Sequence, residues 1–226
     1  MPSWPIHLAL ANKINKNLSL GDEFIFGNVM PDILDGYAID SPSTITKKYE
    51  THFRRPGDGH VDITKFLETY KEEMHNPLVL GYLSHIMADN YFNTYTYTHH
   101  VTCNNRQKTL ILKDGTIIEN YQGKPYLIKQ SDFKIFDRKL INENLLPTIN
   151  MITPNNPIKE CPITDKDIQK TILKINNLAN EKEKYDKNNY QMFTEEELQQ
   201  VFSACYKEIL NKLKALKWAF FILKNH

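Results

Sequence analysis

The sequence predicts a mostly α-helical domain with a small β-hairpin insertion, and three observations favour this fold class. Residues 80–93 are apolar around almost the whole circumference of a helix, which is typical of a helix buried inside a bundle. Two later stretches open on a threonine followed three residues on by an acidic residue, a pair that caps helix N-termini. A hairpin signal occurs around Asp114-Gly115.

Length and composition indicate a single domain over residues 1–226. The chain has 226 residues, 41% of them hydrophobic and 24% charged, as in an ordinary globular protein. A net charge of +1 gives the whole chain no attraction to nucleic acids or anionic membranes. The three cysteines form no Cys-x-x-Cys pair, so neither a disulfide framework nor a thiolate zinc site is indicated. No leader and no apolar run of the ~18 residues that span a membrane is visible, so the expected location is cytoplasmic.

A first helix is predicted over residues 4–18, with Ser3 as its N-cap. Apolar residues and His7 recur on it at helical spacing, so His7 faces the core, either as a packed structural residue or as a ligand. Residues 24–36 mix apolar residues with glycine and proline, which predicts a buried turn into a short helix that starts near Asp32. There the carboxylate either favours the helix dipole or serves a site.

Residues 51–60 combine turn-forming residues with Phe53 as an aromatic anchor. His52 therefore lies on a segment that packing holds in place. The two arginines that follow, Arg54 and Arg55, either contact a phosphate group or are solvated.

The central helix is predicted over residues 77–93, after Asn76 as its N-cap. His85 and Asp89 interrupt its apolar surface, and their separation of four residues places both on one face. Gly81, one turn earlier, is expected to leave room above the imidazole. A buried carboxylate needs a cation, hydrogen-bond donors or a metal. The alternative is that the two side chains only bond to each other.

The rest of the chain predicts a β insertion at about residues 109–129 and further helices. Strands are expected at 109–113 and 116–119, and residues 126–128 are expected to add a third strand. The apolar C-terminal end either packs in the core or touches a membrane surface peripherally. The remaining helices are predicted over residues 62–75, 136–150, 165–183 (capped by Thr164 and Asp167) and 195–224 (capped by Thr194 and Glu197).

Imidazoles and carboxylates at core-facing positions suggest a metal site. These groups are the usual non-thiolate ligands of zinc and similar metals. His99 and His100 follow the central helix, and since adjacent side chains point in different directions, at most one of them is expected to join the site. The predicted core set is His7, Asp32, His52, His85 and Asp89.

Four segments together resemble the zinc-dependent phospholipases C and the related P1/S1-type nucleases. They lie in the N-terminal part of the chain and carry the resemblance as an ordered set. The segments are Trp4 with His7, Gly27-Asn28-Val29-Met30-Pro31-Asp32, Thr51-His52-Phe53, and Gly81-Tyr82-Leu83-Ser84-His85-Ile86-Met87-Ala88-Asp89.

The resemblance implies a phospholipase C/P1 nuclease-like helical bundle with one to three zinc ions. One ion would be held by Asp32, His52, His85 and Asp89, and Asp89 would bridge to a second ion held by His7 and by main-chain groups of an N-terminal tryptophan. The implied reaction is phosphodiester hydrolysis by metal-activated water. In that reaction Asp32 would be catalytic, positioning or deprotonating the water.

Three features depart from the family pattern. Trp4 is not the first residue of the chain, Tyr95 stands where the family has a further histidine ligand, and no later His-x3-acid pair follows. His99 or His100 would then replace the missing ligands.

The expected function is a metal-dependent hydrolase that cleaves a phosphodiester in a phospholipid or another phosphoester. One alternative is a non-catalytic, metal-stabilised binding module that keeps the fold without turnover. The other is a helical interaction domain in which the histidines and aspartates form buried pairs only.

Overall fold

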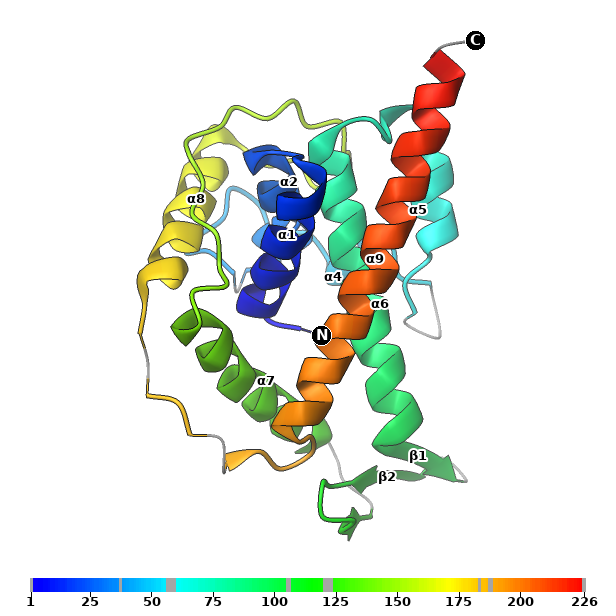
Figure 1. Cartoon of the computed structure of the whole chain (residues 1–226), viewed down its shortest axis with the longest axis vertical. Coiled ribbons are helices and arrows are strands. Elements are labelled where there is room, and N and C mark those ends of the chain that lie inside the picture. Colours follow the sequence, from blue (N-terminus) through cyan, green and yellow to red (C-terminus); the bar gives the residue numbers. More distant parts are fainter. Residues whose placement is uncertain are drawn as a thin grey trace.

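The computed structural model is mostly α-helical and contains a small three-stranded antiparallel sheet, as the sequence predicts (Figure 1). The structure describes residues 2–36, 38–55, 60–104, 107–119, 124–182, 184–186 and 189–224.

Helix α6 (Pro77–His99) forms the centre of the molecule. The Asn76 side chain accepts a hydrogen bond from the Leu78 amide and caps the helix, which then runs on to His99, past the predicted end at residue 93. Its residues from Leu78 to Asp89 are buried without a break. Helices α1 (Trp4–Leu18), α2 (Asp22–Gly27) and α9 (Glu195–Lys224) pack against it, and Figure 1 shows α6 and α9 side by side.

Two glycines set how closely α2 and α6 approach. A Cβ atom on Gly81 would lie 2.1 Å from the carbonyl oxygen of Phe24, and one on Gly27 would lie 2.2 Å from that of Leu78. The two backbones therefore touch, which no larger residue permits. The prediction that Gly81 makes room for an imidazole is wrong; Gly81 makes room for the backbone of α2.

Short elements connect α2 to α6 and carry two of the predicted site residues. They are α3 (Met30–Ile33), α4 (Lys48–Thr51), α5 (Ile63–Thr69) and a 3-10 turn (Lys71–Glu73). The predicted helix over residues 62–75 thus ends at Thr69. Its N-cap is Asp62, whose carboxylate accepts from the Lys65 amide.

The β insertion lies earlier in the chain than predicted. Strands β1 (Val101–Asn104), β2 (Gln107–Ile111) and β3 (Ile117–Ile118) pair in the order β1-β2-β3. The hairpin around Asp114-Gly115 is confirmed, with Leu110 opposite Ile118 and Gly115 at φ +83°.

The predicted third strand at residues 126–128 is wrong, because these residues belong to α7 (Lys124–Asn142). Helix α7 also replaces the predicted helix over residues 136–150. Its buried residues recur every three or four positions, so this periodicity outweighs the local strand preference of Tyr126-Leu127-Ile128. Lys129, Phe133, Phe136 and Leu140 are buried at this spacing, and Asp132, Ile135, Asp137 and Ile141 beside them are buried as well.

Both predicted capping pairs are confirmed. The Thr164 side chain and the Asp167 carboxylate form a capping box at the start of α8 (Asp165–Asn180). Before α9, the Glu197 amide donates to Thr194 Oγ1, and the Thr194 amide donates to the Glu197 carboxylate.

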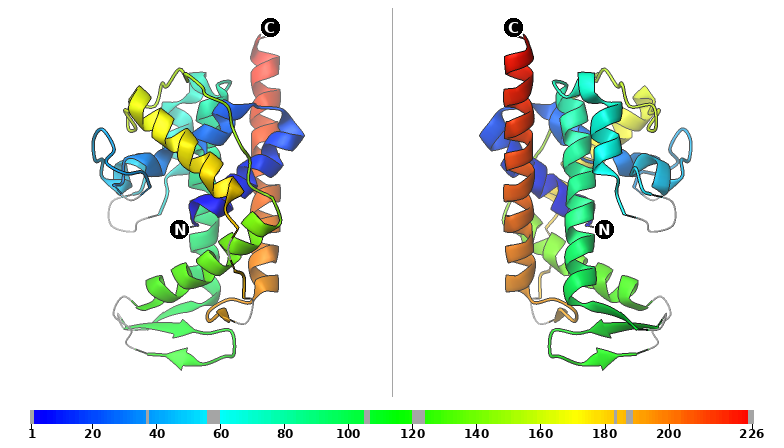
Figure 2. Two further views of the ribbon diagram at one scale, coloured as in Figure 1. Left: turned by 90° about the vertical axis from the view of Figure 1, so that its left-hand side faces the viewer. Right: turned by 90° about the vertical axis from the view of Figure 1, so that its right-hand side faces the viewer.

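Helix α9 extends past the helical body at its C-terminal end, opposite the sheet (Figures 1 and 2). At this end Trp218 is 69% exposed, so its side chain does not pack in the core. No helix in the described ranges is long and apolar enough to cross a membrane.

Candidate metal centre

The fold brings together the five residues that the sequence placed in the core set. His7 comes from α1, Asp32 from α3, and His85 and Asp89 from α6; His52 directly follows α4. The three imidazoles and Asp89 are fully buried, and Asp32 is 6% exposed. Four segments that are separate in sequence thus meet inside the core.

Aromatic packing holds the segment that carries His52. Phe53 has a left-handed backbone (φ +50°), which is unusual for an aromatic residue. Its buried ring packs edge-on against Phe66 and Tyr82, with ring centroids 5.0 and 6.3 Å apart. Phe53 is therefore the anchor that the sequence predicted, and its packing offsets a backbone strain located beside the site.

The polar atoms of the centre face one another across short distances. His52 Nε2 lies 3.2 Å from Asp32 Oδ1 and 3.6 Å from Asp89 Oδ2. His7 Nε2 lies 3.4 Å from Asp89 Oδ1, and His85 Nε2 lies 3.9 Å from Asp32 Oδ2. Two buried triads, His7/Asp32/His85 and His52/His85/Asp89, have ligand atoms within 4.8 Å of one another and could each hold a metal ion.

The contacts of His85 and Asp89 go to other segments, which argues against a simple pair within α6. His85 Nδ1 donates to the carbonyl oxygen of Asn28 at 2.7 Å. Because a carbonyl only accepts, this bond places the proton on Nδ1 and leaves the Nε2 lone pair facing the centre. His52 is oriented in a similar way, since its Nδ1 lies 2.9 Å from Thr51 Oγ1.

The centre contains buried polar atoms that the protein itself does not satisfy. In the described part of the chain, both ring nitrogens of His7 and both carboxylate oxygens of Asp89 lack a hydrogen-bond partner. The Nε2 atoms of His52 and His85 approach each other to 3.3 Å, an arrangement that a cation between them would stabilise. Since buried polar atoms are nearly always satisfied, this donor set fits a bound metal ion.

Protonation states also favour metal binding. Burial, together with the charge of His7, lowers the pKa of His85 to about 3, so its imidazole is neutral at physiological pH. Burial opposes ionisation of Asp32 and Asp89, yet the neighbouring imidazoles outweigh it and hold the pKa of both carboxyls below the ordinary value. Neutral imidazole and ionised carboxylate are the forms that bind metals.

Two predicted ligands, His99 and His100, lie elsewhere. His99 follows Asp89 by ten residues on the same helix, which corresponds to about 15 Å along its axis. It is exposed and stacks on the Tyr95 ring. His100 Nε2 lies 2.7 Å from Glu197 Oε1, at the start of α9. The prediction that one of them joins the site is not supported by this geometry, because α6 continues beyond Asp89 to His99 and carries both histidines along its axis away from the centre.

Sequence reasoning missed Lys48 and Lys129, which lie near the two carboxylates. Lys48 Nζ lies 3.0 Å from Asp32 Oδ1 and 3.5 Å from Asp35 Oδ2. Lys129 is buried on α7, and its Nζ donates to Asn93, one turn after Asp89. A lysine in a polar stretch carries no local signal of such a contact, so only the tertiary structure reveals it.

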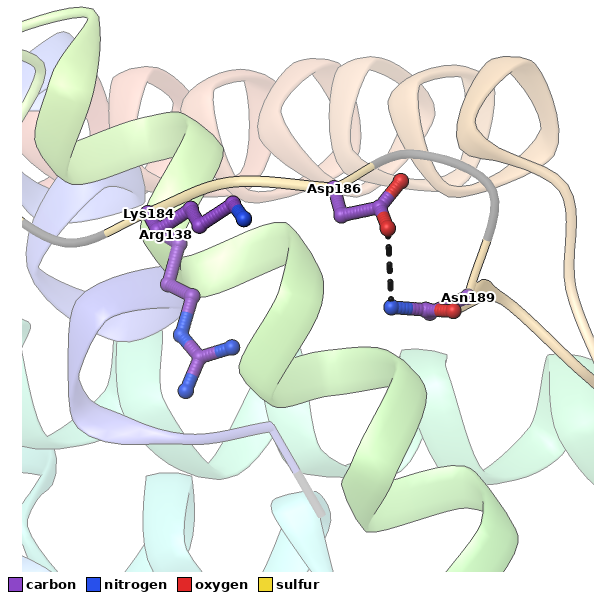
Figure 3. Close-up of a pocket in the computed structure, with 4 residues that line it drawn as sticks. All are labelled: Arg138, Lys184, Asp186 and Asn189. Carbon is purple, nitrogen blue, oxygen red and sulfur yellow. Dashed lines mark hydrogen bonds between the residues drawn. The ribbon is translucent and has the colours of Figure 1, made fainter.

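A separate pocket of about 340 Å³ lies between α7 and the segment before α9. Arg138, Lys184, Asp186 and Asn189 line it, and the Asn189 side-chain amide donates to the Asp186 carboxylate (Figure 3). The pocket shares no lining residue with the centre and is not part of it.

A scan against models of protein families finds no matching model, and searches of curated proteins and of solved structures find no match. Function is therefore argued from the geometry and chemistry of the centre.

Proposed function

We propose that this protein is a metal-dependent hydrolase that cleaves phosphodiesters. The observation that carries the proposal is a buried cluster in which four segments bring three imidazoles and two carboxylates together, and in which the ring nitrogens of His7 and the carboxylate oxygens of Asp89 have no hydrogen-bond partner among the described residues. A protein that needed these residues for packing alone would pair them or replace them with apolar residues.

The five side chains offer enough ligands for more than one ion. Following the family resemblance, Asp32, His52, His85 and Asp89 would hold one ion, and Asp89 with His7 would hold another. A metal bound there would supply a Lewis acid for a phosphoryl oxygen and would lower the pKa of a coordinated water.

Asp32 is the residue best placed to handle water. It is the least buried member of the set, with 6% of its surface exposed, and its pKa is held low, so it accepts hydrogen bonds as a carboxylate. The role that we assign to it is to orient the attacking water, since a carboxylate that stays ionised accepts a hydrogen bond from that water.

Phospholipids or other small phosphoesters fit the chain better than nucleic-acid polymers. A polymer substrate engages many phosphates and favours a strongly basic surface, whereas 28 basic residues here face 27 acidic ones.

A second candidate function is a metal-stabilised binding module without turnover. The observation that favours it is the position of His99 and His100 away from the centre, which leaves the family's later ligand positions unfilled. Such a module keeps the metal for its fold alone.

Two measurements on the same preparations distinguish these functions. The first is metal content per chain by plasma mass spectrometry, and the second is hydrolysis of bis(p-nitrophenyl) phosphate with zinc or manganese added. The hydrolase predicts bound metal and turnover, with turnover lost in Asp32→Asn and retained in the control His99→Gln. Bound metal without turnover on any phosphodiester would favour the binding module, and absence of metal would overturn both.

A further inference from the structure

Two cationic side chains flank the carboxylates of the centre on one side. Lys48 Nζ lies 3.0 Å from Asp32 Oδ1, and an Arg54 guanidinium nitrogen lies 3.9 Å from Asp89 Oδ2. Lys48 is the first residue of α4, and Arg54 lies three residues after the last residue of that helix. A single short segment therefore carries both charges together with His52.

This side is also where the centre approaches solvent. The side chains of His7, His52, His85 and Asp89 are wholly buried, whereas that of Lys48 is 39% exposed and that of Arg54 is 25% exposed. Lys48 and Arg54 are therefore cationic side chains that lie next to the carboxylates and that a ligand in solvent can contact.

The balance of charge at the centre depends on metal. Without metal, the carboxylates of Asp32, Asp35 and Asp89 lie beside the cationic side chains of Lys48 and Arg54. Each divalent ion bound by the carboxylates adds two positive charges to the same small volume. Positive charge in excess at a half-buried site is unfavourable and favours the binding of an anion.

We propose that Lys48 and Arg54 bind the phosphoryl oxygens of the substrate beside the metal centre. This inference rests on the proposed function and adds two substrate-binding residues to it. The guanidinium of Arg54 offers paired N–H donors that match two phosphate oxygens, and Lys48 offers a point charge on a flexible stem. A further consequence is that metal and phosphate bind cooperatively, because the negative charge of the phosphate offsets the positive charge that the metal adds.

The experiment is a calorimetric titration of inorganic phosphate into zinc-loaded wild-type protein and variants. Lys48→Gln and Arg54→Gln are each expected to weaken phosphate binding about 10-fold or more, as the loss of a charge-assisted hydrogen bond does. Lys48→Arg restores the charge and is expected to remain within about 3-fold of wild type. The control Lys214→Gln removes one exposed positive charge on α9 and is expected to bind phosphate as wild type does.

Metal content is measured on every sample, which separates this inference from the proposed function. Variants that keep their zinc and their folded circular dichroism spectrum while losing phosphate affinity support the inference. Full phosphate affinity in both glutamine variants overturns it and leaves the hydrolase proposal standing. Loss of zinc from Lys48→Gln also overturns it, because Lys48 would then serve the carboxylates and not the substrate. A wild-type protein without metal overturns both proposals.

Discussion

Asp89 lies close to several residues of the centre and not to a single partner. Its two carboxylate oxygens lie near His7 on α1 and near His52 and Arg54 in the stretch that follows α4. Complete burial opposes ionisation, and the neighbouring imidazoles nevertheless lower its pKa. The surroundings of Asp89 therefore favour a negatively charged side chain at this position.

Replacing Asp89 by asparagine is expected to remove metal while preserving the packing. The amide has nearly the same volume as the carboxylate, but it carries no charge and is a poor ligand. We expect at least a 10-fold loss of metal affinity, measured by competition with a chromophoric chelator. The matched control is Asn93→Asp, which alters a neighbouring polar residue on the same helix and is expected to keep the metal. Wild-type metal content in Asp89→Asn would remove this residue from the ligand set.

Contact between α2 and α6 positions His85. The carbonyl oxygen of Asn28, which follows α2, accepts a hydrogen bond from His85 Nδ1–H, and the glycines at positions 27 and 81 allow this approach. The end of α2 therefore contributes a hydrogen bond to the far side of the His85 ring, and this bond orients the ring.

A methyl group at position 81 tests this contact. Gly81→Ala places a Cβ atom 2.1 Å from a backbone oxygen of α2, so the helices must separate. The expected cost is about 3 kcal/mol of unfolding free energy, near the upper end of overpacking effects. Urea unfolding measures it, and metal affinity is expected to fall as well because the Asn28 contact moves. An unchanged unfolding midpoint would contradict the close approach of the two backbones.

The start of α9 is joined to the C-terminal end of α6 by an ion pair between Glu197 and His100. Burial lowers the pKa of His100, but the hydrogen bond that its ring donates to Glu197 outweighs burial, so the net shift of the pKa is upward from 6.5. Burial raises the pKa of Glu197, and the His100 bond outweighs that too, so the net shift is downward from 4.5.

The sign of each shift fixes the pH dependence. The His100 contribution is fully present below pH 6.5 and is lost as pH rises through its raised pKa in the folded state. The Glu197 contribution is present above pH 4.5 and is lost as pH falls through its lowered pKa. The pair therefore stabilises the protein most between these two pH values.

Replacement of His100 by glutamine is expected to cost about 1 kcal/mol between pH 4.5 and 6.5 and less at higher pH. Urea unfolding across this range measures the difference. Metal content is expected to remain at the wild-type level, since His100 bonds to Glu197 and not to the centre. Loss of metal in this variant would return His100 to the ligand set.

At the scale of the whole molecule, the centre links α1, α3, the end of α4 and α6. Binding of a metal to the folded state alone raises the free energy of unfolding by RT ln(1 + [M]/Kd), about 2.7 kcal/mol at 100 times Kd. For a protein of this length, that corresponds to about 5 to 10 °C in Tm.

Chelation is therefore expected to lower the thermal midpoint of wild-type protein by this amount. Differential scanning calorimetry with and without a chelator measures the change, and readdition of zinc is expected to reverse it. Asp89→Asn serves as the matched control, because a variant without metal has none to lose. A wild-type midpoint that is indifferent to chelator would show that metal does not link these segments.

The sequence by itself determined the mostly helical fold class, the buried centre of α6, both capping pairs, the Asp114-Gly115 hairpin and the histidines and aspartates of the buried cluster. These features depend on short segments: an apolar circumference, a cap at a fixed spacing, or two polar residues four positions apart on one helix. His7, Asp32, His52, His85 and Asp89 followed from such patterns and from the family resemblance. The structure brings all five together.

Only the tertiary structure decided which segments touch. In the structure, residues 126–128 are helical, and Gly81 allows the backbone of α2 to approach α6 closely. His100 pairs with Glu197, and Lys48 lies beside Asp32. Each of these outcomes depends on the packing of segments far apart in the chain, where burial of large apolar faces outweighs local preferences. A local pattern indicates which chemical group lies on which face of an element, and the packing of distant segments decides which residue that group contacts.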